Sequence, residues 1–206
     1  MKSFSCWLLL LCFLSCTQRP STPQKRPKLV SVDSSILKKD PNPYEPVDLS
    51  PMDMSYLPAD YPKMAVRPSP PIARVIYSRP HKQGRKIFGT LVKFGEPWRL
   101  GANEATEIEF FVPVTIQKKT IPAGRYILYC IPFQDHWTMV FNANLNSWGL
   151  TLDPSKDLYR FDIPISVKPQ SVEYFSMVFQ AKEQGSDLVM AWDSVEARLP
   201  LQYKQK

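Results

Sequence analysis

Apolar side chains recur at every second position from about residue 72 to the end of the chain, and this period restricts the possible folds. In the segment 106–112, Thr106, Ile108, Phe110 and Val112 share one side, while the glutamates between them face the other way. Residues two apart lie on the same face of a β-strand, whereas the faces of a helix repeat about every 3.6 residues. No convincing amphipathic helix pattern interrupts the alternation. We therefore predict an all-β domain.

The strand-like segments are short, and turn residues separate them. Proline and glycine in Ile121–Gly124, for example, are typical of a tight turn between strands. The predicted strands are Ile72–Tyr77, Thr106–Val112, Val114–Gln117, Arg125–Ile131, His136–Phe141, Tyr159–Val167, Val172–Gln180, Leu188–Trp192 and Val195–Leu201. About eight or nine short strands at this spacing predict an antiparallel β-sandwich over residues 72–206.

Residues 16–71 differ sharply in composition from the predicted domain. Twelve of the 21 prolines fall in residues 20–71, which contain no glycine. Dense proline removes backbone donors and prevents regular helix, so we predict a largely irregular, extended tether. The apolar residues of Tyr44–Ala65 leave two alternatives open, a solvated linker or a segment that lies against the domain.

The first residues have the features of a targeting signal. Lys2 precedes a short apolar run, Trp7–Leu14, which is too short to span a bilayer. Leu14-Ser15-Cys16 then leads abruptly into polar sequence, as in the signals of bacterial lipoproteins. We predict a signal peptide over residues 1–15, lipid attachment at Cys16 and attachment of the chain to a membrane through that lipid. Because Thr17, not aspartate, follows the cysteine, we expect an outer-membrane anchor in the cell envelope with the domain facing the periplasm.

One cysteine falls in the predicted domain. Cys6 and Cys12 lie in the signal and Cys16 is the predicted lipid site, so Cys130 has no partner for an internal disulfide. It lies in an apolar run with no basic neighbour, which favours a small buried hydrophobic residue over a reactive thiol. With two histidines and no pair of sulfur ligands, we predict neither a metal site nor a bound cofactor.

The positive charge of the predicted domain is concentrated in one stretch. The chain carries a formal net charge of +7, and the window 79–99 holds six Lys or Arg residues against one acid, Glu96. Nucleic-acid binders usually spread basic residues over a long face, whereas one local cluster suits a small anion. We therefore expect no nucleic acid as a partner.

The same stretch supplies the candidate site. Arginine suits bidentate recognition of carboxylate or phosphate, and an aromatic side chain can stack on a ligand. Gly101 permits a close backbone approach, and an asparagine can donate and accept. The candidate ligand-binding residues are Arg79, Arg85, Trp98, Arg99, Asn103 and Glu104.

Three interpretations of these residues remain open. They could form a structural ion-pair network in which Glu104 balances Arg99, or a site for a polar or anionic ligand. They could also form a catalytic site in which Glu104 acts as a base. In the ligand-binding and the catalytic interpretations, an anion between neighbouring guanidiniums relieves the charge repulsion between them.

Several strings in this part of the chain resemble a known family. They are Tyr77-Ser78-Arg79-Pro80, Gly84–Gly89, Trp98–Thr106, Ile121–Tyr126 and Asn142 through Trp148-Gly149. Over Ile72 to Leu201 the chain resembles the bacterial family described as domain of unknown function 2911. The resemblance implies a β-rich, exported domain and carries over no activity.

We rank three functions by these observations. The first is a lipid-anchored envelope protein that binds a polar or anionic ligand through the Arg79–Thr106 loop. The second is a structural partner of another envelope protein, recognised through exposed aromatic surface. The third is a hydrolase that uses Glu104, with arginine stabilising the developing negative charge.

Overall fold

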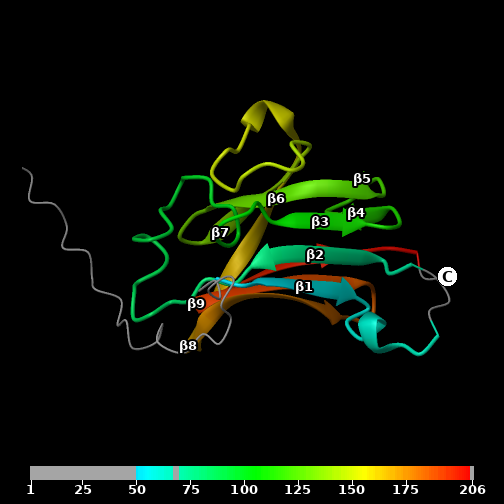
Figure 1. Ribbon diagram of the computed structural model, residues 1–206, viewed down its shortest axis with the longest axis horizontal. Coiled ribbons are helices and arrows are strands. Elements are labelled where there is room, and N and C mark those ends of the chain that lie inside the picture. The colour runs from blue at the N-terminus through cyan, green and yellow to red at the C-terminus, as the bar shows by residue number, and fades with distance from the viewer. Residues whose placement is uncertain (1–49, 67–69, 205–206) are drawn as a thin grey trace, which may run out of the picture. The chain divides into compact units, whose positions relative to one another are not determined.

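The computed structural model describes residues 50–66 and 70–204, so the predicted signal peptide and Cys16 lie outside the described residues. The described part is built almost entirely of strands, with two short 3-10 helices, η2 (Tyr61–Lys63) and η3 (Pro154–Lys156) (Figure 1). The all-β prediction is confirmed. The strands are β1 (Met52–Leu57), β2 (Ala73–Ser78), β3 (Glu107–Phe110), β4 (Val114–Ile116), β5 (Lys119–Ile121), β6 (Gly124–Pro132), β7 (His136–Asn142), β8 (Asp157–Ala181) and β9 (Ser186–Leu201). No helix among the described residues is long and apolar enough to cross a membrane.

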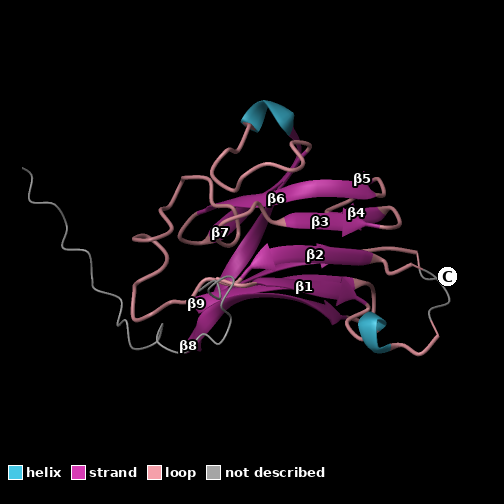
Figure 2. Cartoon of the chain, viewed as in Figure 1, coloured by secondary structure: helices cyan, strands magenta, loops and turns pink. Residues whose placement is uncertain are grey.

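Seven strands form one antiparallel sheet that curls on itself, as Figure 2 shows, and β4 and β5 form a separate two-stranded sheet. The order in the large sheet is β1-β2-β3-β6-β7-β8-β9. β8 pairs with β7 through its first half and with β9 through its second half. β8 also lies near β1 and β2, so the curled sheet brings its two ends close together.

β8 and β9 are much longer than the strands that the alternation predicts. β8 joins two predicted strands, 159–167 and 172–180, into one continuous strand. β9 does the same for the predicted strands 188–192 and 195–201. Lys168-Pro169-Gln170-Ser171 has the composition of a turn. The hydrogen-bonded pairing of β8 with β9 nevertheless continues on both sides of it, with register shifts between Val167 and Val172 and between Val172 and Ser176. A bulge tolerates proline within a strand and bends the sheet. The prediction of short strands is therefore wrong here, because the polar segment is a bulge.

β1 lies in the stretch predicted as tether. Met52–Leu57 pairs with β2 along its whole length, from Met52 opposite Ser78 to Leu57 opposite Ala73. The predicted boundary at Ile72 is therefore too late, and of the two alternatives for Tyr44–Ala65 this part lies against the domain. Pro51 and Pro58 flank a proline-free window that is just long enough for a strand, and proline density averaged over the tether conceals it.

A cluster of aromatic side chains fills the core between the facing parts of the sheet. Trp137 and Trp192 are buried. Trp98 contacts both, with ring centroids 5.7 Å and 5.8 Å apart, and Phe175 lies 5.0 Å from Trp98. Cys130 is also fully buried, and burial raises the pKa of its thiol. The expectation of a small buried hydrophobic residue is confirmed.

We expect alkaline pH to destabilise the fold through Tyr129. Burial, and then the carboxylate of Asp157, raise the pKa of this phenol above its usual value. The unfolded chain loses the phenolic proton above about pH 10 while the folded chain retains it, so the free energy of unfolding falls as pH rises beyond that point. Urea unfolding at a series of pH values, compared between the native chain and Tyr129→Phe, measures this effect. An equally steep alkaline loss in the variant would show that Tyr129 is not responsible.

Candidate functional site

Two loops meet beside the sheet. The first, residues 79–106, joins β2 to β3, and the second, residues 143–156, joins β7 to β8. Glu104 and Trp148 form an isolated antiparallel β-bridge between these loops. The amide of Gly149 donates to the carbonyl of Asn103 at 3.2 Å. Two of the strings named above, 98–106 and 142–149, are therefore in direct contact.

Two glycines allow this close approach. A Cβ at Gly101 would lie 2.9 Å from the carbonyl oxygen of Ser78, so the predicted role of Gly101 in close backbone approach is confirmed. A Cβ at Gly149 would lie 2.3 Å from Cδ of Arg99 and 2.6 Å from the carbonyl oxygen of Asn103. Real Cβ atoms do not come this near to other atoms, so only glycine fits at position 149 as the loops stand.

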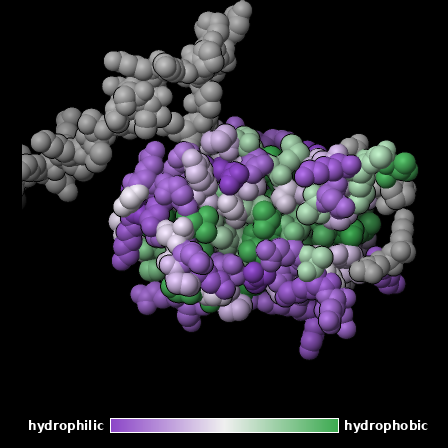
Figure 3. Space-filling model, turned by 90° about the horizontal axis from the view of Figure 1, so that it is seen from below, coloured by the Kyte–Doolittle hydropathy of each residue, from purple (hydrophilic) through white to green (hydrophobic). Residues whose placement is uncertain are grey.

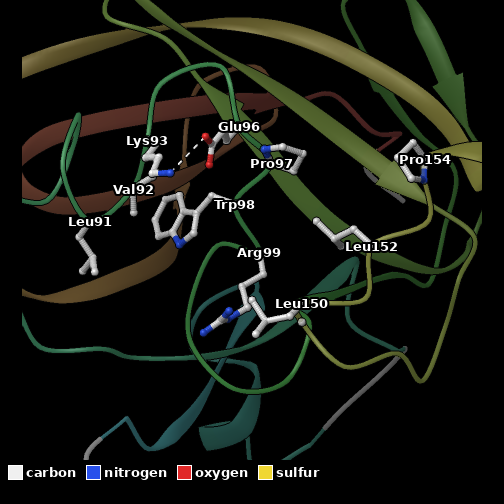
Figure 4. Close-up of a pocket in the computed structure, with 11 residues that line it drawn as sticks. Leu91, Val92, Lys93, Glu96, Pro97, Trp98, Arg99, Leu150, Leu152 and Pro154 are labelled. Carbon is white, nitrogen blue, oxygen red and sulfur yellow. Dashed lines mark hydrogen bonds and ion pairs between the residues drawn. The ribbon is translucent and has the colours of Figure 1, made fainter. Parts of the chain in front are cut away.

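A pocket of about 410 Å³ lies between the two loops. The 79–106 loop supplies one wall and the 143–156 loop supplies the other (Figure 4). The lining residues are Leu91, Val92, Lys93, Glu96, Pro97, Trp98, Arg99, Gly149, Leu150, Leu152 and Pro154.

Arg99 is the uncompensated charge of this pocket. Its Nε is buried and has no hydrogen-bond partner, and burial lowers the pKa of the guanidinium. Figure 4 shows the guanidinium beside Leu150, away from the dashed contact between Lys93 and Glu96, whose Nζ and Oε1 are 3.4 Å apart. No described carboxylate forms an ion pair with Arg99. Two cations against one acid leave the lining with a formal charge of +1.

Trp98 supplies an aromatic wall that is held in place by its backbone. Its amide donates to the carbonyl of Cys130 at 2.7 Å, and its own carbonyl accepts from Cys130 at 2.9 Å. This pairing joins the loop to β6. The indole lies partly in the aromatic core and partly along the pocket. A side chain packed in this way gives a ligand a rigid apolar surface.

Both loops of the pocket lie in a region that matches a known protein family. A family model described as protein of unknown function (DUF2911) matches residues 69–201. The chain belongs to the DUF2911 family. The resemblance predicted over Ile72–Leu201 is confirmed. No curated protein and no solved structure gave a match.

Arg79 has a structural position within the DUF2911 domain. Its guanidinium donates to Asp53 at 3.1 Å, to the hydroxyl of Ser176 at 3.2 Å and to the carbonyl of Phe175 at 3.3 Å. It also lies over the ring of Tyr174, 5.8 Å from the centroid. Asp53 belongs to β1, outside the matched range, so Arg79 fastens the added strand to the family domain.

Arg85 also has its hydrogen bonds within the protein. Its guanidinium donates to the backbone carbonyls of Lys82, at 2.9 Å, and of His81. These contacts close the turn at the start of the 79–106 loop. Arg79, Arg85 and Arg99 share no partner among the described residues, and neither Arg79 nor Arg85 lines the pocket. The structural interpretation fits Arg79 and Arg85 but not Arg99.

Asn103 and Glu104 contribute through their backbone. Asn103 has a φ of 54°, a conformation that asparagine tolerates better than most residues, and its carbonyl holds Gly149. Glu104 is exposed and forms no ion pair with any described residue, so the expected pairing with Arg99 is absent there. Neither residue lines the pocket.

Sequence reasoning missed the second wall of the pocket. Leu150, Leu152 and Pro154 are ordinary apolar loop residues with no chemical signature of their own. The string that ends at Trp148-Gly149 was the available signal, because Leu150 follows it directly in the chain. The described residues contain no group of three or more histidine, cysteine, aspartate or glutamate side chains that could hold a metal ion.

Proposed function

We propose that this protein is a lipid-anchored component of the bacterial cell envelope that binds a small anionic ligand with an apolar part in the Arg99 pocket. The observation that carries the binding proposal is the buried, unpartnered Nε of Arg99. Buried polar groups normally have hydrogen-bond partners, and a carboxylate or phosphate would supply one in a charge-assisted bond. The burial of Nε would strengthen that bond.

The other lining residues support an amphiphilic small molecule. Trp98, Leu91, Leu150 and Leu152 offer apolar surface around the guanidinium. The volume, about 410 Å³, lies toward the lower end of the range of roughly 300–1,000 Å³ that is common for small-molecule sites. We therefore propose a compact organic acid or phosphate ester, held by Arg99 at its charged end.

The anchor and the location remain proposals that rest on the N-terminal sequence. The short apolar run and Leu14-Ser15-Cys16 support a lipid on Cys16, and Thr17 supports an outer-membrane destination. A periplasmic domain on a proline-rich tether would meet small solutes there.

We expect Arg99→Gln to weaken binding of an anionic probe by about tenfold to a hundredfold, because the probe loses a charge-assisted hydrogen bond to a buried nitrogen. Phenylacetate and phenyl phosphate serve as probes, with phenylacetamide as the neutral comparison. Binding is measured by tryptophan fluorescence and by the shift in Tm that each probe causes.

Arg85→Gln is the matched control, since Arg85 carries the same charge in the same loop but does not line the pocket. Circular dichroism of each variant verifies that the fold is retained. Equal loss of binding in both variants would attribute the effect to net charge and would contradict a site at Arg99. Failure of both anions to stabilise the native chain would also count against the proposal.

A second candidate is a structural partner of another envelope protein. It is favoured by apolar side chains exposed near the pocket, with Leu150 73%, Trp148 49% and Leu91 48% exposed. Large exposed apolar side chains that lie together often mark contact surfaces. A hydrolase ranks last, because Glu104 does not line the pocket.

A further inference from the structure

We propose a second binding site in this protein, for the acyl chain of a long-chain fatty acid, at the end of the sheet opposite to the Arg99 pocket. The Arg99 pocket lies toward the end of β2 at Ser78, where Gly101 contacts the backbone. The second site lies toward the other end, where β1 finishes at Leu57 opposite the start of β2 at Ala73. It does not depend on the function proposed for Arg99.

The cavity at this end has a volume of about 1480 Å³. One wall comes from the end of β1 and the start of β2, and the other comes from the β4–β5 sheet and the C-terminal residues after β9. The parts of the second wall are joined by backbone contacts, since Thr115 of β4 and Gln202 after β9 exchange hydrogen bonds of 2.7 Å and 2.9 Å. The hydroxyl groups of Tyr203 and Ser186 lie 2.9 Å apart and fix the C-terminal wall.

The lining is mainly apolar. Among its lining residues, Leu57 and Phe179 are buried, and Ile72, Phe111 and Tyr203 are half-buried. Figure 3 shows apolar side chains exposed among polar ones from the middle of the face seen from below towards the end that carries η2. Half-buried apolar side chains around an open cavity gain stability when an apolar ligand removes them from water.

Size and charge together indicate the class of ligand. The cavity exceeds the range of roughly 300–1,000 Å³ that is usual for drug-sized molecules, so it has room for an acyl chain. Its two charged lining residues, Asp60 and Lys204, are exposed. Lys204 forms no ion pair with any described residue and can pair with a carboxylate, while the hydroxyls of Thr115 and Thr120 offer it hydrogen bonds.

A fluorescent fatty acid tests this proposal. A dansyl-labelled undecanoate should show brighter, blue-shifted emission on binding the native chain, and palmitate should displace it. Ala181→Trp, at the end of β8, and Thr120→Trp, in β5, place an indole at two exposed positions that line the cavity. We expect each to weaken the binding by about tenfold or more, because the indole occupies space that the acyl chain needs.

Ala143→Trp is the matched control, as Ala143 is also exposed but lines neither pocket. It should bind the probe like the native chain, and Arg99→Gln should do the same. Lys204→Gln should weaken the binding of palmitate several-fold while leaving that of the uncharged hexadecanol unchanged.

Three results would overturn the proposal. The first is no binding of the probe by the native chain, and the second is equal binding by the native chain and both wall variants. The third is loss of binding in Arg99→Gln with the wall variants unaffected, which would place the acyl chain in the Arg99 pocket and leave the proposed function intact.

Discussion

Asp157→Ala should lower the free energy of unfolding by about 3–5 kcal/mol, because it removes the centre of a nearly buried polar network. The side chain of Asp157 is 9% exposed. The hydroxyl of Tyr129 lies 2.8 Å and 2.9 Å from its two oxygens, and Nδ2 of Asn142 donates to it at 2.7 Å. Arg160 completes the network at 2.6 Å. Without the carboxylate, the buried hydroxyl of Tyr129 loses its acceptor, and the amide of Asn142 keeps the carbonyl of Asp153 as its remaining acceptor.

The network also holds the 143–156 loop. Nδ2 of Asn142 donates to the carbonyl of Asp153 at 2.7 Å, and its Oδ1 accepts from the amide of Asn144 at 2.7 Å. Because this loop forms the second wall of the Arg99 pocket, Asp157→Ala should also weaken binding of the anionic probe although Asp157 does not line the pocket.

Urea unfolding followed by circular dichroism measures the loss, and Asp162→Ala is the matched control. Asp162 lies on the same strand, is exposed and accepts one hydrogen bond, from Thr138 at 2.6 Å. Its removal should lower stability by less than about 1 kcal/mol. If the two alanine variants lose the same stability, Asp157 is not the centre of a stabilising network. If Asp157→Ala does not fold, the double variant Asp157→Asn with Tyr129→Phe tests the same network with a smaller loss of stability.

The period of the apolar side chains was sufficient for the fold class, because strands such as β2 and β3 bury alternate side chains. The apolar period could not predict the length of β8, because a bulge and a turn contain the same polar residues. They differ only in whether the strand pairs with its neighbour again beyond those residues. β9 shows the same ambiguity, with Asp193 in a left-handed conformation, φ 52°, opposite the bulge. Local composition does not report such continuity, which depends on the partner strand.

Within the candidate site, sequence reasoning identified Trp98 and Arg99 but also grouped Arg79 and Arg85 with them. All three arginines share one charge-rich stretch, and proximity in sequence was the only available criterion. The fold separates them because β2 ends at Ser78, so Arg79 turns towards β1 and β8 while Arg99 lies on a later part of the loop. The partner of Arg79, Asp53, lies in a strand that the composition conceals.

Gly149→Ala should lower the free energy of unfolding by about 3 kcal/mol and abolish most binding of the anionic probe. An alanine in place of glycine at an ordinary φ, with room for the methyl group, stabilises a protein by about 0.4–1 kcal/mol. Gly149 is not among the glycines with positive φ, so an alanine there meets no backbone strain. Whether the free energy of unfolding rises or falls in Gly149→Ala therefore depends on the space around the new methyl group. The new Cβ would lie 2.6 Å from the carbonyl oxygen of Asn103 and 3.1 Å from that of Glu104.

Two further variants separate the contributions to this effect. Leu150→Ala, at the exposed neighbouring position, should change stability by less than about 0.5 kcal/mol and controls for any change in the loop. The double variant Gly149→Ala with Arg99→Ala removes Cδ of Arg99, which lies 2.3 Å from the new methyl group, but leaves the backbone oxygens in place. We expect it to recover only part of the lost stability in urea unfolding. Complete recovery of stability in the double variant would mean that the flexible side chain of Arg99 is the sole obstacle to the methyl group. If Gly149→Ala alone is more stable than the native chain, the two loops do not meet as closely as the contact between Gly149 and Asn103 requires.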